Sequence, residues 1–275
     1  MTPTELARYR DDGVVVLRGF VDPRRCDELR ARAAELVAAF EPGALRSVFT
    51  TEDQARRTDD YFLDSGEAIH FFFEDEAVGA DGAGTCAKER AINKIGHALH
   101  DLDPVFDAFS RRPALAALCG ELGVVDARLV QSMYIFKPPF IGGAVRVHQD
   151  ATFLHTEPEG VVGLWFALED AREDNGCLWA IPGGHRAGLK SRFVREDRTT
   201  RTETLDAAPW DETAAVPLEA AKGDVIVLDG LVPHFSHANR SSASREAYTV
   251  HVLPAASTFP STNWLRRVTP PRGFR

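Results

Sequence analysis

A histidine and an aspartate stand two positions apart in the run RVHQDATF, which covers residues 146–153. The apolar and β-branched residues around them predict a strand, on which side chains two positions apart point to the same face. The imidazole of His148 and the carboxylate of Asp150 are therefore expected to converge on one point, as two ligands of a metal ion do. A His-x-Asp pair by itself is a common pattern, so it gives only a hypothesis for a metal site.

A second histidine, His234, follows the stretch VIVLDGLVP at residues 225–233. We expect it at the end of a strand, where it can meet His148 and Asp150 if the strands share a barrel interior. Two histidines and one carboxylate leave coordination positions open on a metal ion. This geometry suits a catalytic Fe(II), which must also bind a co-substrate and O2. Structural zinc needs four protein ligands, usually thiolates, and the sequence offers no such group here.

Arg245 lies eleven residues beyond His234 (234 to 245) and begins a further predicted strand. A hairpin of this length returns the chain to the neighbourhood of the metal site. A guanidinium there can hold a carboxylate through two parallel hydrogen bonds. 2-Oxoglutarate, which chelates iron at one end, carries such a carboxylate at the other. Residue type alone favours a solvent-exposed arginine; the position after His234 is what indicates a binding role.

Helical patterns dominate the first half of the chain. Residues 4–12 predict a short helix that Gly13 ends, and a long amphipathic helix follows Asp22-Pro23. Residues 14–20 predict a strand, and residues 91–122 again predict helix. The second half is rich in predicted strands, at residues 129–136, 144–153, 161–168, 177–181, 224–228 and 246–253.

Several strands with little helical pattern between them favour a β-sandwich or barrel, supported by the helices of the first half. A chain of 275 residues permits one domain of this kind, and we expect one. The segment 186–222 is long, charged and poorly patterned, which is typical of a functional lid or a disordered loop.

Composition narrows the class of partner. The net charge of −9 argues against non-specific nucleic-acid binding, and no apolar run approaches the ~20 residues that span a bilayer. The N-terminal residues lack a signal-peptide pattern, and the four cysteines are widely spaced, which favours reduced thiols. We therefore expect a cytoplasmic protein that acts on a small molecule, without nucleic-acid or membrane partners. The oligomeric state is not readable.

The sequence resembles the phytanoyl-CoA dioxygenase family of 2-oxoglutarate oxygenases along nearly its whole length. The matching segments are DGVVVLRGF near the start, TDDYFLDSGEAIHFFFE at 58–74, INKIGHALHDLDPVF at 92–106, VQSMYIFKPP at 130–139, HQDATFLHTEP at 148–158, DNGCLWAIPGGH at 174–185 and REAYTVHVL at 245–253. The resemblance implies a mainly β fold with N-terminal helices (α+β): a double-stranded β-helix, or cupin-like jelly roll. It divides residues 1–275, taken as one 2-oxoglutarate/Fe(II) dioxygenase domain, into helical support at 1–125 and a jelly-roll core at 126–255.

The resemblance also implies roles for single residues. His148, Asp150 and His234 match the iron ligands, and the family places the third ligand directly after Leu-Val-Pro, which favours His234 over His237. Arg245 matches the residue that pairs with the far carboxylate of 2-oxoglutarate. Ser236 matches a hydroxyl that supports this carboxylate, and Lys94, Met133 and Trp165 match positions that line the co-substrate pocket. On composition alone, Met133 and Trp165 would be ordinary inward-facing barrel residues and Lys94 a solvated helix residue. His251, in a predicted strand, is either a buried core histidine or a pocket residue.

The implied reaction couples oxidative decarboxylation of 2-oxoglutarate, with O2, to hydroxylation of a C–H bond. Related halogenases lack the carboxylate ligand, so Asp150 favours hydroxylation over halogenation. The primary substrate is not readable, and the resemblance does not by itself imply a CoA ester. Two alternatives remain open on the sequence: a metal-dependent hydrolase that uses the same cluster, and a non-catalytic small-molecule binding protein on the same barrel.

Overall fold

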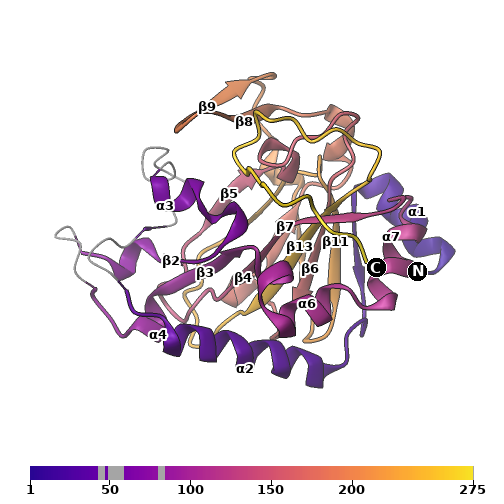
Figure 1. Ribbon diagram of the computed structural model, residues 1–275. Coiled ribbons are helices and arrows are strands. Elements are labelled where there is room, and N and C mark those ends of the chain that lie inside the picture. Colours follow the sequence, from indigo (N-terminus) through magenta and orange to yellow (C-terminus); the bar gives the residue numbers. More distant parts are fainter. Residues whose placement is uncertain (43–46, 49–58, 80–83, 275) are drawn as a thin grey trace.

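The computed structural model describes residues 1–42, 47–48, 59–79 and 84–274 (Figure 1). Its α-helices are α1 (Pro3–Asp12), α2 (Pro23–Ala39), α3 (Asp60–Leu63), α4 (Lys88–Ala91), α5 (Leu99–Leu102), α6 (Pro104–Ser110) and α7 (Pro113–Glu121). Its strands are β1 (Val14–Leu17), β2 (Ile69–Phe73), β3 (Ile92–His97), β4 (Arg128–Ile135), β5 (Val145–His148), β6 (Val162–Ala167), β7 (Leu178–Ala180), β8 (Ser191–Glu196), β9 (Thr199–Thr204), β10 (Val216–Leu218), β11 (Val225–Asp229), β12 (His234–Ser236) and β13 (Ala247–Leu253).

Two antiparallel sheets form the body of the protein. The larger sheet has seven strands in the order β1-β11-β6-β13-β4-β3-β2, and the smaller has four in the order β10-β7-β12-β5. Non-consecutive strands lie side by side in both sheets, as they do in a jelly roll, because long connections carry the chain from one sheet to the other. The predicted mainly β fold, a double-stranded β-helix with N-terminal helices, is confirmed.

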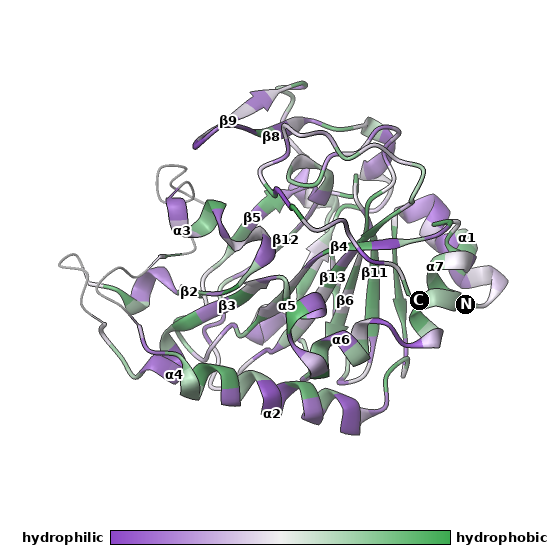
Figure 2. Cartoon of the chain, in the orientation of Figure 1, coloured by the Kyte–Doolittle hydropathy of each residue, from purple (hydrophilic) through white to green (hydrophobic). Residues whose placement is uncertain are grey.

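Alternation along the strands separates two faces of the larger sheet. On β6, Leu164 and Phe166 belong to the main hydrophobic cluster, which also includes residues of α2, α6 and α7. The intervening Trp165 points to the other side, toward the smaller sheet, and lines a cavity. The helices therefore cover one face of the larger sheet, and the space between the sheets remains for the site. In Figure 2 the central strands are largely green, while α2 carries both green and purple segments.

The prediction of helix over residues 91–122 was wrong for its first part. Ile92–His97 is strand β3, completely buried between β2 and β4. A short apolar run of this kind does not distinguish a buried helix from a buried strand by periodicity. With β1 and β2, this strand gives residues 1–125 three of the seven strands of the larger sheet, so that region is more than helical support.

The predicted long segment 186–222 has structure of its own. It contains the antiparallel hairpin β8–β9, with Ser191 opposite Thr204, and then strand β10 at the edge of the smaller sheet. In Figure 1 the hairpin projects above the open end of the sheets. Within the described ranges, no helix is long and apolar enough to cross a membrane.

Candidate functional site

His148 and His234 face each other across two neighbouring strands of the smaller sheet. His148 is the last residue of β5 and His234 the first of β12, and the two are direct partners in the antiparallel register. Their rings lie 4.3 Å apart between centroids. The prediction that His234 ends the strand before it was therefore inaccurate: that strand, β11, stops at Asp229, and His234 begins a strand of its own.

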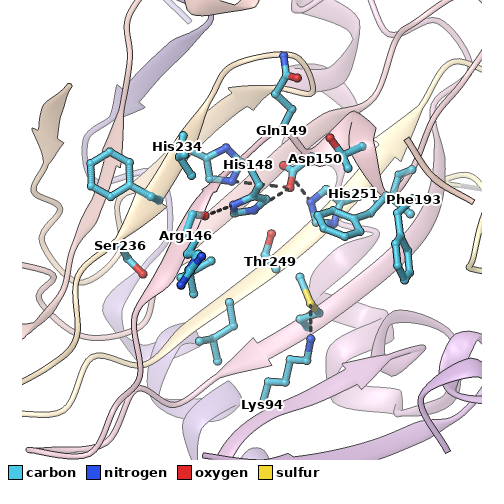
Figure 3. Close-up of a pocket in the computed structure, with 18 of the residues that line it drawn as sticks. Lys94, Arg146, His148, Gln149, Asp150, Phe193, His234, Ser236, Thr249 and His251 are labelled. Atoms are coloured by element: carbon cyan, nitrogen blue, oxygen red, sulfur yellow. Dashed lines mark hydrogen bonds and ion pairs between the residues drawn. The ribbon is translucent and has the colours of Figure 1, made fainter. Parts of the chain in front are cut away.

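Asp150 joins the two histidines from a turn. Strand β5 ends at His148, and Asp150 begins a 3-10 turn, so the expected strand alternation does not place it. A backbone hydrogen bond from Ala151 N to Gly230 O, 2.9 Å long, fixes the turn instead. Oδ1 of Asp150 lies 3.9 Å from Nε2 of His148 and 3.7 Å from Nε2 of His234. Figure 3 shows the three side chains pointing toward one another.

In His148 and His234, the hydrogen bond of Nδ1 determines which ring nitrogen carries the proton. Nδ1 of His148 lies 2.9 Å from the carbonyl oxygen of Arg146, and Nδ1 of His234 lies 3.0 Å from that of Val232. Because a carbonyl can only accept, each Nδ1 must carry the proton. Each Nε2 therefore presents a lone pair toward Asp150, which is the arrangement that metal-binding histidines show. Ligand atoms of these three residues all lie within 4.8 Å of one another, so together they can hold one metal ion.

His251 holds the other oxygen of the carboxylate. Its Nε2 lies 3.2 Å from Oδ2 of Asp150, and its side chain is buried in β13. Burial alone would raise the pKa of Asp150, but His251, by its charge and its hydrogen bond, lowers it below its ordinary value. The carboxylate is thus ionised, with Oδ1 turned to the two histidines and Oδ2 to His251. Both alternatives left open for His251 hold, because it is a buried histidine with a polar partner and it also lines the cavity.

Replacing His251 with phenylalanine should weaken binding of Mn(II) or Co(II) by about 10- to 100-fold, since the aspartate loses the partner that orients it. Titration of the metal-free protein measures the affinity. His237→Phe is the matched control, because His237 is exposed and packs against Trp179 on the outside. Equal affinities for the two variants would contradict an orienting role for His251.

Gly163 provides the space that the Asp150 carboxylate occupies. A Cβ at this position would lie 2.9 Å from Oδ2 of Asp150, closer than real Cβ contacts allow. We expect Gly163→Ala to displace the carboxylate and to lower metal affinity on the order of 10-fold, with little effect on the rest of the fold. Gly120→Ala in α7 meets nothing within 4 Å and serves as the control. Unchanged affinity in the Gly163 variant would show that the carboxylate has another position available.

The buried guanidinium of Arg245 lines the same cavity. Arg245 is 2% exposed, its Nε donates to Gly176 O at 3.1 Å, and its Nη1 has no hydrogen-bond partner in the described structure. Its guanidinium carbon lies 5.3 Å from the centre of the Trp165 ring. Burial lowers the pKa of Arg245 to about 10, which still leaves the group charged at neutral pH. A buried cation with an unused donor is suited to an anionic ligand.

Three of the remaining predicted residues lie on strands of the larger sheet, and the fourth, Ser236, lies on the smaller sheet. Trp165 on β6, Thr249 on β13 and Met133 on β4 are successive register partners, and Gly96 of β3 lies opposite Met133. Lys94 of β3 is buried, with Nζ 4.0 Å from the sulfur of Met133. Ser236, at the end of β12, accepts a hydrogen bond from Lys137. All eight predicted site residues line one cavity of about 390 Å³: Lys94, Met133, His148, Asp150, Trp165, His234, Ser236 and Arg245.

Sequence reasoning missed Thr249 and Lys137, both of which line the cavity. A signal for Thr249 was present, because residues 245, 247, 249 and 251 alternate onto the face of Arg245. Lys137 gave no signal, because lysine is usually exposed. Gln149, between two candidate ligands, also lines the cavity, but its side chain points away from theirs and bonds to Gly188, Lys190 and Leu231 (Figure 3). It therefore links Gly188 and Lys190, which lead into the β8–β9 hairpin, to the end of β5.

The cavity continues outward between aromatic side chains. Phe153 and Phe193 pack at 5.6 Å between ring centres, and Phe62 stacks on Trp264 at 4.3 Å. Phe193 belongs to β8, so the hairpin segment contributes directly to the cavity wall. Buried Arg195, also on β8, donates to the carbonyl oxygens of Leu63 and Trp264. Three segments distant in sequence thus share this wall.

Comparison with known proteins gives one consistent family. The family model "Phytanoyl-CoA dioxygenase (PhyH)" matches residues 9–247. "Phytanoyl-CoA dioxygenase domain-containing protein 1" of Rattus norvegicus is 43% identical, covering 98% of this chain and 96% of the relative. "Phytanoyl-CoA dioxygenase 1" of Oryza sativa subsp. japonica is also 43% identical, covering 99% and 96%.

Solved structures share the fold at lower identity. The non-heme alpha ketoglutarate dependent carbocyclase SnoK from nogalamycin biosynthesis matches with a TM-score of 0.68 and 18% identity, covering 99% of this chain and 93% of that one. EctD from S. alaskensis, solved with 2-oxoglutarate and 5-hydroxyectoine, matches with a TM-score of 0.67 and 19% identity, covering 100% and 86%.

Proposed function

The chain belongs to the phytanoyl-CoA dioxygenase family of Fe(II)- and 2-oxoglutarate-dependent oxygenases, and from that premise we propose that it hydroxylates a C–H bond of a small organic substrate. One observation carries the proposal: two histidines and a carboxylate converge beside a buried arginine with an unused donor. This pairing supports a metal ion and a dicarboxylate bound next to each other. The expected iron, 2-oxoglutarate and O2 follow from the family.

We propose His148, Asp150 and His234 as the iron ligands. Their donor set fits Fe(II): two neutral imidazole nitrogens and one ionised carboxylate oxygen, with no fourth His, Cys, Asp or Glu ligand grouped with them in the described residues. When bound, the iron activates O2 and supplies the oxidant for the C–H bond. The protein's part is to hold each Nε2 free of its proton through the Nδ1 bonds and to keep Oδ1 of Asp150 directed inward through His251.

Arg245 and Ser236 are proposed to receive the far carboxylate of 2-oxoglutarate. The guanidinium is held in place by its bond to Gly176 and its packing on Trp165, so little side-chain freedom is lost when the carboxylate binds. Trp165 and Met133 form the walls beside the chain of the co-substrate, and Lys94 adds a positive charge at the same end of the larger sheet. Burial of Arg245, Ser236 and Lys94 excludes water and so strengthens their interactions with an anion.

The hairpin segment within residues 186–222 is proposed to act as a lid over the substrate. Phe193 of β8 lines the cavity, and Lys190, just before β8, packs on Trp210 with Nζ 4.0 Å from the ring centre. The aromatic outer wall favours a substrate with an apolar or planar body. Closing such a wall over the substrate would keep water from the reacting atoms.

The test is consumption of 2-oxoglutarate by the Fe(II)-loaded protein. We expect formation of succinate that requires both Fe(II) and O2, and that increases when a candidate from a metabolite panel is hydroxylated. Activity supported by zinc without O2 would instead identify a metal-dependent hydrolase. Binding of small molecules without succinate formation across broad panels would identify a non-catalytic binding protein.

A further inference from the structure

A second buried cation lies next to Arg245. Lys137, just beyond the end of β4, is 2% exposed and lines the cavity. Its carbonyl oxygen accepts from the backbone N of Arg245 at 3.3 Å and from Nδ2 of Asn239 at 3.0 Å. Neither Lys137 nor Arg245 forms an ion pair with a carboxylate in the described structure. Two buried cations thus share one end of the cavity without an anionic partner in contact.

The chain around Lys137 is shaped to admit its side chain. A Cβ at Gly176 would clash with Cε of Lys137, and a Cβ at Gly142 would lie 2.8 Å from its Cγ. Gly176 also provides the carbonyl that holds Nε of Arg245. Without a Cβ at either position, the two glycines leave a channel that the lysine stem occupies, and Gly176 lies against both Lys137 and Arg245.

The hydrogen bonds of Lys137 determine what Ser236 can do. Nζ of Lys137 lies 2.9 Å from Oγ of Ser236 and 2.8 Å from the carbonyl oxygen of Gly143. An ammonium group only donates, so Oγ of Ser236 must accept from it. The hydroxyl hydrogen of Ser236 is then left to donate to another group. A carboxylate beside Arg245 is an acceptor of the right kind.

We infer that Lys137 is a positioning residue for the co-substrate, which orients the Ser236 hydroxyl to donate to the far carboxylate of 2-oxoglutarate. The inference rests on the proposed function, since it assigns a further residue to the same carboxylate site. Burial, and then the charge of Arg245, hold the pKa of Lys137 well below its ordinary value, while Glu74 opposes this. A carboxylate at this place reverses the effect of Arg245 and favours the charged lysine.

The experiment is anaerobic calorimetry of 2-oxoglutarate binding to the Mn(II)-loaded protein. The variants are Lys137→Met, Ser236→Ala and both together, with Lys222→Met as a surface-lysine control, since Lys222 pairs with Asp27 outside the cavity. We expect each single variant to lose on the order of ten-fold in affinity. Because Lys137 acts through Ser236, the double variant should bind no more than about two-fold more weakly than Ser236→Ala.

A 2-oxo acid without the far carboxylate separates positioning from general damage. We expect the Lys137→Met variant to bind pyruvate with the same affinity as the unchanged protein, because pyruvate has only the metal-chelating end. Lys137→Gln keeps a donor in the channel and should recover part of the affinity for 2-oxoglutarate; it also provides a second variant if Lys137→Met does not fold.

Three results would overturn the inference: unchanged 2-oxoglutarate affinity in both Lys137 variants, equal losses for 2-oxoglutarate and pyruvate, or a double variant as weak as the product of the single losses. If Arg245→Met loses 2-oxoglutarate while the Lys137 variants do not, only the role of Lys137 fails. If the unchanged protein does not bind 2-oxoglutarate, the proposed function fails with it.

Discussion

Replacing Asp150 with alanine is expected to abolish Fe(II)-dependent succinate formation, with a decrease of more than about 100-fold. The variant loses one of three proposed ligands and leaves His251 buried without its 3.2 Å partner. Two imidazoles alone hold Fe(II) weakly, so the affinity for Mn(II) or Co(II) should fall with the activity. Succinate release and metal titration, measured on the same preparation, check both expectations.

The matched control for Asp150 is Asp174→Ala. Asp174 is an exposed carboxylate paired with Arg172 at 3.3 Å in a surface turn, away from the cavity. This variant should retain the activity and metal affinity of the unchanged protein. Full activity in the Asp150 variant would exclude the carboxylate as a ligand and, with it, the assignment of the three-residue site.

Replacing Arg245 with methionine is expected to weaken 2-oxoglutarate binding by at least about 2 kcal/mol, roughly 30-fold. Methionine keeps much of the buried volume but removes the donors that we assign to the far carboxylate. Metal affinity should remain, because none of the three proposed iron ligands contacts Arg245 through a hydrogen bond or ion pair in the described structure. Calorimetry with the Mn(II)-loaded protein separates the two effects.

Arg240→Met is the control for the arginine variant. Arg240 lies on the exposed loop before Arg245 and pairs with Glu76 at 2.9 Å. Its loss should leave 2-oxoglutarate affinity within about two-fold, as for an exposed ion pair. Equal binding by the Arg245 and Arg240 variants would show that the far carboxylate is held elsewhere.

The residues of the three-residue cluster, His148, Asp150 and His234, were predicted more accurately than the elements on which they lie. His148 and Asp150 were expected on one strand, but Asp150 lies in a 3-10 turn held by Gly230, which is 80 residues away (150 to 230). Residue types and spacing carry chemical information, but a turn that depends on a distant backbone contact cannot be read from the local pattern. The same holds for His234, whose strand exists because β5 and β7 lie on either side of it.

Burial of charge was the other limit of sequence reasoning. Lysine and arginine are mostly exposed in proteins, so a pattern-based expectation puts Lys137 at the surface. The burial of Lys137 depends on glycines at positions 142 and 176, which approach it only after folding. His251, by contrast, could be placed on the face of Arg245 by counting along one strand. The strand order of each sheet, which determines the residues that face His251, could not be predicted by such counting.

The three-residue cluster draws on both layers of the sandwich. His148 and His234 belong to the smaller sheet, and Asp150 is bonded to His251 of the larger one. An ion bound here therefore ties the two layers together, and its uptake is thermodynamically linked to folding. At a free ion concentration about 100 times the dissociation constant, such linkage adds about 2.7 kcal/mol to the free energy of unfolding. The metal-free protein should accordingly melt at a lower temperature, with a midpoint that rises as the ion is added.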